Sequence, residues 1–332
     1  MVELFAVDVV DTHTQGMPTR VVLDGVGDLP GRTMVERRQY FLDEMQDLRT
    51  LLMCEPRGHE AMTGALLQSS SRSDADVGVI WMEVQGSIRA CGHGAMGVAT
   101  VLVATGRVPL REPVTTVRLD TPSGLVVARV QVDNGRAGGV TVSMPPSFCL
   151  TTDLVVDVAG FGPLSCDVAY GGNFCVITDL ERLGLPFDRA RRAEIMQAGM
   201  AVVAAVAQQL PLTHPDGSPA ELRHAQLLAP GSTAAHSRHA MVISPGWFDR
   251  SPCGTGTAAR MAQLHASGEL AIGQQFVNES FIGTRFTGRL TGETDVGSRP
   301  GVVPELTGQA FVTGSARLVL DPDDPLPAGF LV

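Results

Sequence analysis

Short hydrophobic runs in the first half of the chain predict β-strands separated by turns. Aliphatic and β-branched residues dominate these runs, and turn-forming residues bound them. The predicted strands cover residues 5–10, 20–23, 78–84, 116–119, 125–132 and 139–143. Between them, residues 35–53 carry apolar side chains at helical spacing, which predicts one amphipathic helix. The Pro145–Pro146 pair interrupts the pattern and marks a candidate domain boundary.

The second half of the chain repeats this plan. Asp188 can cap a helix over residues 189–210, which is rich in Ala and Met, and residues 214–218 read as a loop. Further strands are predicted at residues 167–169, 174–177, 239–243, 286–290 and 309–320.

Two segments that begin at cysteines indicate an internal duplication. Cys91 opens CGHGAMGVATVLVATGRV, and Cys253 opens CGTGTAARMAQLHASGEL. Aligned at the cysteines, six positions agree: Gly at +1 and +3, Leu at +11, Ala at +13, Gly at +15 and an aliphatic residue at +17. This agreement predicts two homologous halves, each with a central helix that begins at the cysteine and ends at a C-capping glycine.

The length of the chain also favours two domains. Its 332 residues exceed what one hydrophobic core usually serves. We expect an N-terminal domain over residues 1–150 and a C-terminal domain over residues 151–315, with a final strand in 316–332 that returns to the first domain. The predicted class is α/β (α+β).

Composition and charge exclude several functions. The net charge of −10 argues against binding to nucleic acid or to an anionic membrane. No apolar run is long enough to span a bilayer, and acidic residues near the N-terminus are unlike a signal peptide. We therefore expect a cytoplasmic protein with reduced thiols. The six cysteines show no CxxC spacing, which disfavours a zinc or thioredoxin-like site.

A cysteine at a helix start has distinctive chemistry. Unsatisfied N–H groups and the helix dipole lower the pKa of the thiol toward neutrality. Glycines at +1 and +3 leave those N–H groups open to a carboxylate. If the helices at Cys91 and Cys253 face each other, one thiolate can remove a proton from one face of a bound acid while the other thiol protonates the opposite face. This arrangement inverts a stereocentre beside a carboxylate.

Other sites are weaker candidates. The segments CGHG and CGTG lack the lysine of a phosphate loop and the GxGxxG of a dinucleotide site. His236 and His239 form an HxxH pair without a third ligand, so we expect no metal and no cofactor. The remaining cysteines are expected to be inert packing residues: Cys54, Cys149, Cys166 and Cys175.

Nearly end to end, the chain resembles the proline racemase family, which includes 4-hydroxyproline 2-epimerases and trans-3-hydroxyproline dehydratases. DRSPCGTGTAAR, at residues 249–260, is the most specific motif. The other motifs add order and spacing: DTHTQGMPTRVV at 11–22, EPRGHEAMTGALL at 55–67, CGHG at 91–94, YGGNF at 170–174 and IGTRFTGR at 282–289. The resemblance implies a diaminopimelate-epimerase-like fold, in which two pseudo-symmetric domains each wrap a curved, mainly antiparallel sheet around a central helix, with the active site between them.

The resemblance also implies roles for individual residues. Cys91 and Cys253 would be the catalytic acid–base pair, and Asp249 and the His93 side chain would bind the ring nitrogen. The carboxylate would be held by the backbone of four residues: Gly92, His93, Gly254 and Thr255. Three further residues in the motifs are interpreted as structural: His13, Arg57 and His59.

The choice among family activities rests on a few positions. Dehydratase members replace the second cysteine, typically with Thr, so Cys253 favours epimerisation. His224, in LRHAQLL, favours 4-hydroxyproline over proline as the substrate, because a polar pocket group needs a polar partner. Three other functions remain alternatives: a proline racemase, a trans-3-hydroxyproline dehydratase and a non-catalytic amino-acid-binding protein. The oligomeric state also stays open, with a homodimer as one alternative. Ring specificity stays open where the chain departs from the family pattern: Met17, Arg89, Ala90 and Cys175.

Overall fold

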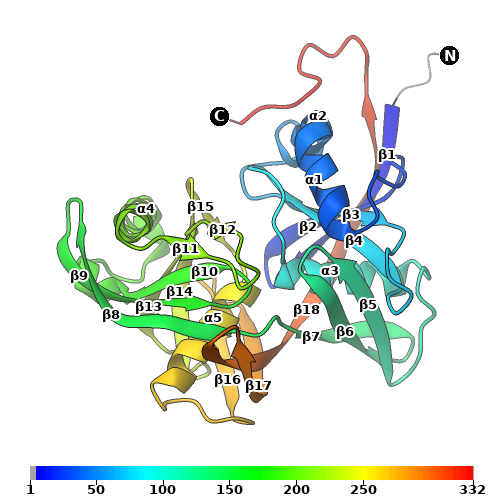
Figure 1. Cartoon of the computed structure of the whole chain (residues 1–332). Helices are drawn as coiled ribbons and strands as arrows, with labels where there is room; N and C mark the ends of the chain where they lie inside the picture. The colour runs from blue at the N-terminus through cyan, green and yellow to red at the C-terminus, as the bar shows by residue number, and fades with distance from the viewer. Residues whose placement is uncertain (1–4, 332) are drawn as a thin grey trace. The chain divides into compact units, whose positions relative to one another are not determined.

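The computed structural model describes residues 5–331, which form two compact units (Figure 1). The first unit contains the chain up to Val142 together with the chain from Gly308 onward, and the second contains Ser143–Thr307. The sequence pattern predicts a boundary at residue 150 and a return at residue 316. The return begins at Gly308 because one continuous strand, β18 (Arg299–Leu320), contributes its first part to the second unit and its last part to the first.

The first unit is a seven-strand path with three helices, to which the last part of β18 is added. The strands pair in the order β1-β2-β3-β4-β5-β6-β7, and residues 310–320 of β18 pair with the free side of β1. The pairs β2–β3 and β4–β5 are parallel. The elements are β1 (Phe5–Thr14), β2 (Met17–Asp24), α1 (Met34–Glu44), α2 (Gln46–Met53), β3 (Thr63–Gln68), β4 (Val77–Glu83), α3 (Gly92–Ala104), β5 (Val114–Thr121), β6 (Gly124–Asp133) and β7 (Arg136–Ser143).

The second unit has the strand order β8-β9-β10-β13-β14-β16-β17-β18, in which β10–β13 and β14–β16 are parallel. Short strands β11 (Leu212–Thr213) and β12 (Pro219–Ala220) form a separate pair, and β15 (Trp247–Asp249) pairs with β14. The other elements are β8 (Phe148–Val158), β9 (Gly162–Tyr170), β10 (Phe174–Asp179), the 3₁₀ turns η1 (Leu180–Leu183) and η2 (Arg189–Arg191), α4 (Arg192–Gln209), β13 (His224–Pro230), β14 (Ser237–Ile243), α5 (Gly254–Ala266), β16 (Gln275–Glu279) and β17 (Arg285–Val296).

The two units share one plan. In each unit, seven pairs of neighbouring strands follow one another across the sheet. The first two pairs are antiparallel, the third is parallel, the fourth antiparallel, the fifth parallel, and the last two antiparallel. Helices provide the crossovers that parallel neighbours require: α1 with α2 and then α3 in the first unit, α4 and then α5 in the second. The predicted pseudo-symmetric fold with mainly antiparallel sheets is confirmed.

The first unit takes its outer strand from a distant part of the chain. β8 follows β7 of the first unit along the chain, yet it pairs with β9 of the second. The last part of β18 follows residues of the second unit, yet it pairs with β1 of the first. The second unit is therefore continuous in sequence, whereas the first is completed by the last part of β18.

Helices α3 and α5 are the central helices of their units. α3 packs against β1, β2, β3, β5 and β6, and α5 packs against β8, β9, β10 and β17. Small and aliphatic side chains allow this enclosure, and every α3 residue from Gly92 to Val103 is buried. Each helix is followed by a glycine with left-handed φ, Gly106 at +69° and Gly268 at +77°, so the predicted C-capping glycines are confirmed.

The prediction of one helix over residues 35–53 is wrong, because the chain forms α1 and α2 with a break at Met45. The Gln46 side chain donates hydrogen bonds to the carbonyls of Phe41 and Leu42, which satisfies acceptors at the end of α1. The predicted cap at Asp188 accepts from the N–H of Ala190, but it begins η2, after which α4 starts.

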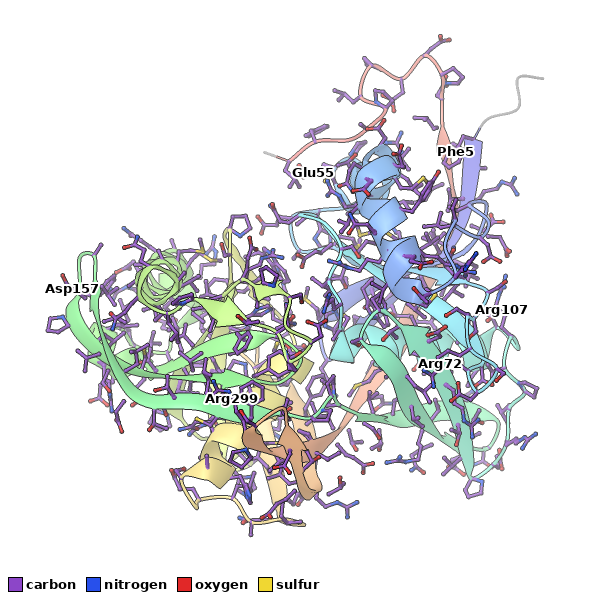
Figure 2. The ribbon with its side chains drawn as sticks, in the orientation of Figure 1. Phe5, Glu55, Arg72, Arg107, Asp157 and Arg299 are labelled. Carbon is purple, nitrogen blue, oxygen red and sulfur yellow. The ribbon has the colours of Figure 1, made fainter. Side chains whose placement is uncertain are left out.

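The C-terminal segment returns to the loop after α2. The Phe330 backbone exchanges two hydrogen bonds with Glu55, of 2.8 and 2.9 Å, and Arg57 pairs with Asp324 at 2.7 Å. Figure 2 labels Glu55 in this region. No helix among residues 5–331 is both long and apolar enough to cross a membrane.

Candidate active site

Cys91 lies at the N-cap of α3 in extended backbone conformation, with φ of −144°. Its Sγ lies 3.7 and 3.6 Å from the two ring nitrogens of His93. A Cβ at Gly94 would lie 2.7 Å from this Sγ and 3.0 Å from the ring of Trp81. The glycine at +3 is therefore required because the thiol folds back over the first helical turn.

The His93 side chain is held inside the first unit. Its Nε2 lies 3.0 Å from Thr63 Oγ1, and its backbone carbonyl accepts a 2.8 Å hydrogen bond from Thr14 Oγ1. The imidazole thus lies between Thr63 and the Cys91 thiol. This places His93 where it contacts a catalytic candidate directly, and its role toward a substrate nitrogen stays a prediction.

Cys253 occupies the corresponding N-cap of α5, but its φ is +58°. Its Sγ accepts a hydrogen bond from the Gly256 N–H at 3.3 Å and lies 3.5 Å from Thr255 Oγ1. A Cβ at Gly256 would overlap Met241 Cε and lie 3.2 Å from Sγ. Both cysteines therefore depend on the glycine three positions later for close contact between the thiol and the helix start.

Burial raises the pKa of the Cys253 thiol well above its ordinary value, and the charge of Asp249 raises it further. The hydrogen bonds from Thr255 and from the Gly256 N–H lower it, but they do not outweigh the burial. The expectation that the helix start brings this thiol toward neutrality is therefore wrong for Cys253 in the unliganded protein. At neutral pH this cysteine therefore keeps its proton.

Asp249, at the end of β15, organises the approach to Cys253. Its Oδ1 accepts two 2.8 Å hydrogen bonds from Ser251, one from the N–H and one from the hydroxyl. The Ser251 hydroxyl oxygen in turn accepts from the Cys253 N–H at 3.1 Å. Among residues 5–331 no donor reaches Oδ2 of Asp249, so that oxygen can accept a hydrogen bond from a ligand.

The start of α5 keeps two donors available. The N–H groups of Gly254 and Thr255 have no acceptor in the described part of the chain, as expected for first-turn amides. The YGGNF segment supports this turn: a Cβ at Gly171 would overlap the Thr255 carbonyl oxygen, and Asn173 Nδ2 donates to Thr255 Oγ1 at 3.3 Å. The sequence marked YGGNF as a motif without indicating this contact.

His224 begins β13 beside Cys175 of β10. Its Nδ1 is enclosed and has no hydrogen-bond partner within residues 5–331. Burial, with a smaller effect from Arg223, lowers the pKa of His224 to about 3. The side chain is therefore neutral at physiological pH, and its Nδ1 is available to a polar group.

The remaining motif histidines make local contacts. His13 Nδ1 accepts from the Gly16 N–H, and His59 Nδ1 accepts from the Ala61 N–H. His236 Nδ1 accepts from the Val277 N–H, whereas His239 faces Asn278 inside the core, so the HxxH pair does not converge on one point. The described residues contain no group of three or more His, Cys, Asp or Glu side chains that could hold a metal ion.

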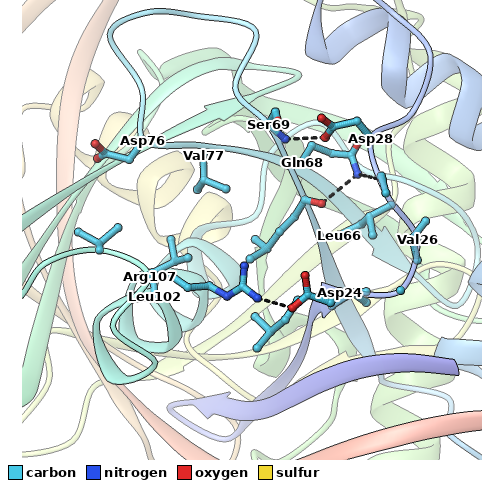
Figure 3. Close-up of a pocket in the computed structure, with 16 residues that line it drawn as sticks. Asp24, Val26, Asp28, Leu66, Gln68, Ser69, Asp76, Val77, Leu102 and Arg107 are labelled. Carbon is cyan, nitrogen blue, oxygen red and sulfur yellow. Dashed lines mark hydrogen bonds and ion pairs between the residues drawn. The ribbon is translucent and has the colours of Figure 1, made fainter.

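A cavity of about 820 Å³ in the first unit is separate from these cysteines (Figure 3). Its polar groups bond to one another: Asp28 accepts from the Ser69 N–H at 2.7 Å, Gln68 donates to the Gly27 carbonyl, and Arg107 pairs with Asp24. Cys91 does not line it. The helix starts, rather than this cavity, carry the candidate chemistry.

Comparisons with known proteins identify the family to which the chain belongs. The proline racemase family profile matches residues 9–331. The chain is 59% identical to a 4-hydroxyproline 2-epimerase of Streptosporangium roseum, over 97% of each chain, and 37% identical to a proline racemase of Acetoanaerobium sticklandii, again over 97% of each. A crystal structure of a hydroxyproline epimerase from Agrobacterium vitis, with bound trans-4-hydroxy-L-proline, superposes with a TM-score of 0.93 at 32% identity, covering 99% of this chain and 95% of that one. The chain belongs to the proline racemase family.

Proposed function

We propose that this protein is a 4-hydroxyproline 2-epimerase, which interconverts trans-4-hydroxy-L-proline and cis-4-hydroxy-D-proline by inverting Cα. The 59% identity to a 4-hydroxyproline 2-epimerase over nearly the whole of both chains supports the activity. The close structural similarity to an epimerase with bound trans-4-hydroxy-L-proline supports the substrate.

The chemistry that we propose needs two cysteines and no redox partner. One thiolate removes the Cα proton, so that an S–H bond forms while the C–H bond breaks and its electron pair moves into the carboxylate. The other thiol then protonates the opposite face of the planar intermediate and becomes a thiolate. In this proposal the first-turn N–H groups of α3 and α5 stabilise the charge on the carboxylate, and Asp249 Oδ2 accepts a hydrogen bond from the ring ammonium.

One observation carries the proposal: each unit has a cysteine at the start of its central helix, with a glycine at +3 against which the sulfur packs. The raised pKa of Cys253 supports the view that this thiol starts the reaction with its proton in place, and in the proposal Cys91 then acts as the base. An ammonium near Asp249 would offset the negative charge that raises this pKa, so substrate binding would ease the reverse role.

Proline racemisation is the second candidate activity, because a proline racemase is 37% identical to this chain. His224 favours the hydroxylated substrate. Its enclosed Nδ1 has no partner among the described residues, and an unpaired buried nitrogen costs about 1–3 kcal/mol that a substrate hydroxyl would recover. Cys253 favours inversion over dehydration, since elimination needs only one base on the Cα face.

Isotope exchange with single-cysteine variants tests the mechanism. In deuterium oxide, Cys91→Ala and Cys253→Ala should each lose inversion by at least roughly 10²–10⁴-fold, the usual effect of a positioned acid–base group. Each variant should still label the one stereoisomer whose Cα hydrogen faces its remaining thiol, and the two should label opposite isomers. The double variant should label neither, whereas Cys54→Ala and Cys149→Ala should keep activity. Inversion at near wild-type rate in either catalytic variant would refute the two-thiol mechanism.

A further inference from the structure

Cys253 has a strained backbone that its neighbours must maintain. Four non-glycine residues in the described chain have positive φ. Three of them lie in a turn or at a strand irregularity: Gln15, Asn134 and Asp153. Cys253, at +58°, is buried and stands at the start of a central helix. A residue with a Cβ keeps this conformation only when the surrounding structure holds it there.

Thr257 holds both peptide groups that define this conformation. Its hydroxyl donates a 2.8 Å hydrogen bond to the Pro252 carbonyl, which precedes the φ bond of Cys253. Its N–H donates a 2.8 Å bond to the Cys253 carbonyl, which follows the ψ bond. The N–H bond to Cys253 is an ordinary backbone hydrogen bond at the start of helix α5. The bond to Pro252 instead requires a side-chain hydroxyl at position 257, one turn into the helix.

The neighbours of Thr257 fix the direction in which its hydroxyl points. The Thr257 hydroxyl has one proton, which it donates to the Pro252 carbonyl. The hydroxyl oxygen must therefore act as the acceptor toward Asn278, whose Nδ2 donates to it at 2.9 Å. This orientation turns Asn278 Oδ1 toward His239 Nδ1, 3.3 Å away, and an amide oxygen requires a proton on that nitrogen. Gln226 Nε2 lies 3.1 Å from the same nitrogen. Because Nδ1 carries a proton in this arrangement, the Gln226 amide must be turned so that its oxygen faces the ring.

The result is a directed chain of donors from His239 through Asn278 and Thr257 to the Pro252 carbonyl. The side chains of Thr257, Asn278 and His239 are fully buried, as is that of Gln226. Water therefore does not replace a hydrogen bond that is lost from this series. Burial also lowers the pKa of His239 to about 4, which keeps the imidazole neutral and in the form that donates to Asn278.

From these contacts we infer that Thr257 is a positioning residue for Cys253, and that Asn278 and His239 orient its hydroxyl. The inference rests on the proposed acid–base role of Cys253. Without the hydroxyl bond, Cys253 can relax toward negative φ, and its sulfur moves away from the Gly256 N–H that lowers the thiol pKa. Cys91, in relaxed extended backbone, has no such dependence.

The test uses Thr257→Val, which keeps the shape of the side chain but removes the hydroxyl, and Thr257→Ser, which restores it. Thr257→Val should lower kcat roughly 10- to 100-fold with KM nearly unchanged, and should move the alkylation of Cys253 by iodoacetamide to higher pH. Thr257→Ser should recover to within about threefold of the wild type. Asn278→Ala should reproduce the Thr257→Val effect in a milder form.

Single-thiol backgrounds separate positioning from general loss of stability. In Cys91→Ala, where only Cys253 exchanges the Cα hydrogen, Thr257→Val should reduce deuterium labelling at least about tenfold. In Cys253→Ala, where only Cys91 acts, Thr257→Val should leave the labelling unchanged. Equal loss in both backgrounds, or no loss in either, would overturn the inference. If Cys91→Ala and Cys253→Ala, each without a change at Thr257, failed to label opposite isomers, the proposed function would fail instead. The pH dependence of Cys253 alkylation would then still test whether Thr257 positions this cysteine.

Discussion

Replacing Gly94 with alanine should displace the Cys91 thiol while leaving the rest of the first unit folded. The new Cβ would lie 2.7 Å from Sγ, and ordinary contacts begin at 3.4 Å, so the sulfur or the helix must move by at least 0.7 Å. Trp81, whose ring would lie 3.0 Å away on another side, prevents the Cβ from escaping in that direction. A displacement near 1 Å at a reacting group costs up to about 10²-fold in rate, so we expect kcat/KM to fall roughly 10- to 100-fold.

Gly97→Ala is the matched control. It makes the same substitution one turn further along α3, where the Cβ would lie 2.8 Å from Thr12 Oγ1 instead of a thiol. Both variants overpack a buried site, which typically costs about 1–3 kcal/mol of unfolding free energy. Epimerisation measured by polarimetry and unfolding measured in urea should therefore separate them, with similar losses of stability and a loss of kcat/KM confined to Gly94→Ala. If Gly94→Ala kept wild-type kcat/KM, or if Gly97→Ala lost as much, the thiol position would not be the cause.

Three further outcomes follow from the second unit. His224→Phe should narrow the preference for trans-4-hydroxy-L-proline over L-proline by about 1–3 kcal/mol in kcat/KM, and equal losses on both substrates would show that His224 does not read the hydroxyl. Asp249→Asn removes a charge that raises the pKa of Cys253, so alkylation of this cysteine should begin at lower pH, and an unchanged alkylation profile would contradict the assigned cause. The pKa of His239 is about 4 in the folded protein and near 6.5 when unfolded, so its contribution to stability is present above pH 6.5 and is lost as the pH falls. Urea unfolding should therefore show that this residue lowers the free energy of unfolding by about 2 kcal/mol when the pH falls from about 7 to about 5, and His239→Gln should not show this decrease.

The internal duplication could be predicted from the sequence because its key backbone positions accept few residue types other than glycine. A sulfur that packs on the first helical turn requires Gly94 and Gly256, and a left-handed helix end favours Gly106 and Gly268. These glycines recur at equal distances from Cys91 and Cys253, so aligning the two segments predicted the central helices and both of their ends.

Other features depended on contacts between distant residues. The break at Met45 follows from a Gln46 side chain that bonds carbonyls of the preceding turn, which helical periodicity does not record. The raised pKa of Cys253 depends on burial, and the hydroxyl of Thr257 beside its strained backbone contacts Asn278 of β16, which periodicity does not indicate. Strands β3 and β13 were missed as strands, although the EPRGHEAMTGALL motif and the LRHAQLL segment that contain them had been noted for other reasons.

The return of β18 to the first unit has a consequence for the order in which the protein is made. The second unit is continuous in sequence and has all of its strands once Thr307 has been synthesised. The first unit is begun earlier but finished later, because β1 pairs with residues 310–320, roughly 300 positions downstream. During translation, β1 therefore keeps one edge unpaired until residues 310–320 emerge, and an open edge of this kind is prone to non-native pairing. All the strands of the second unit are thus available before the first unit receives the strand that covers this edge.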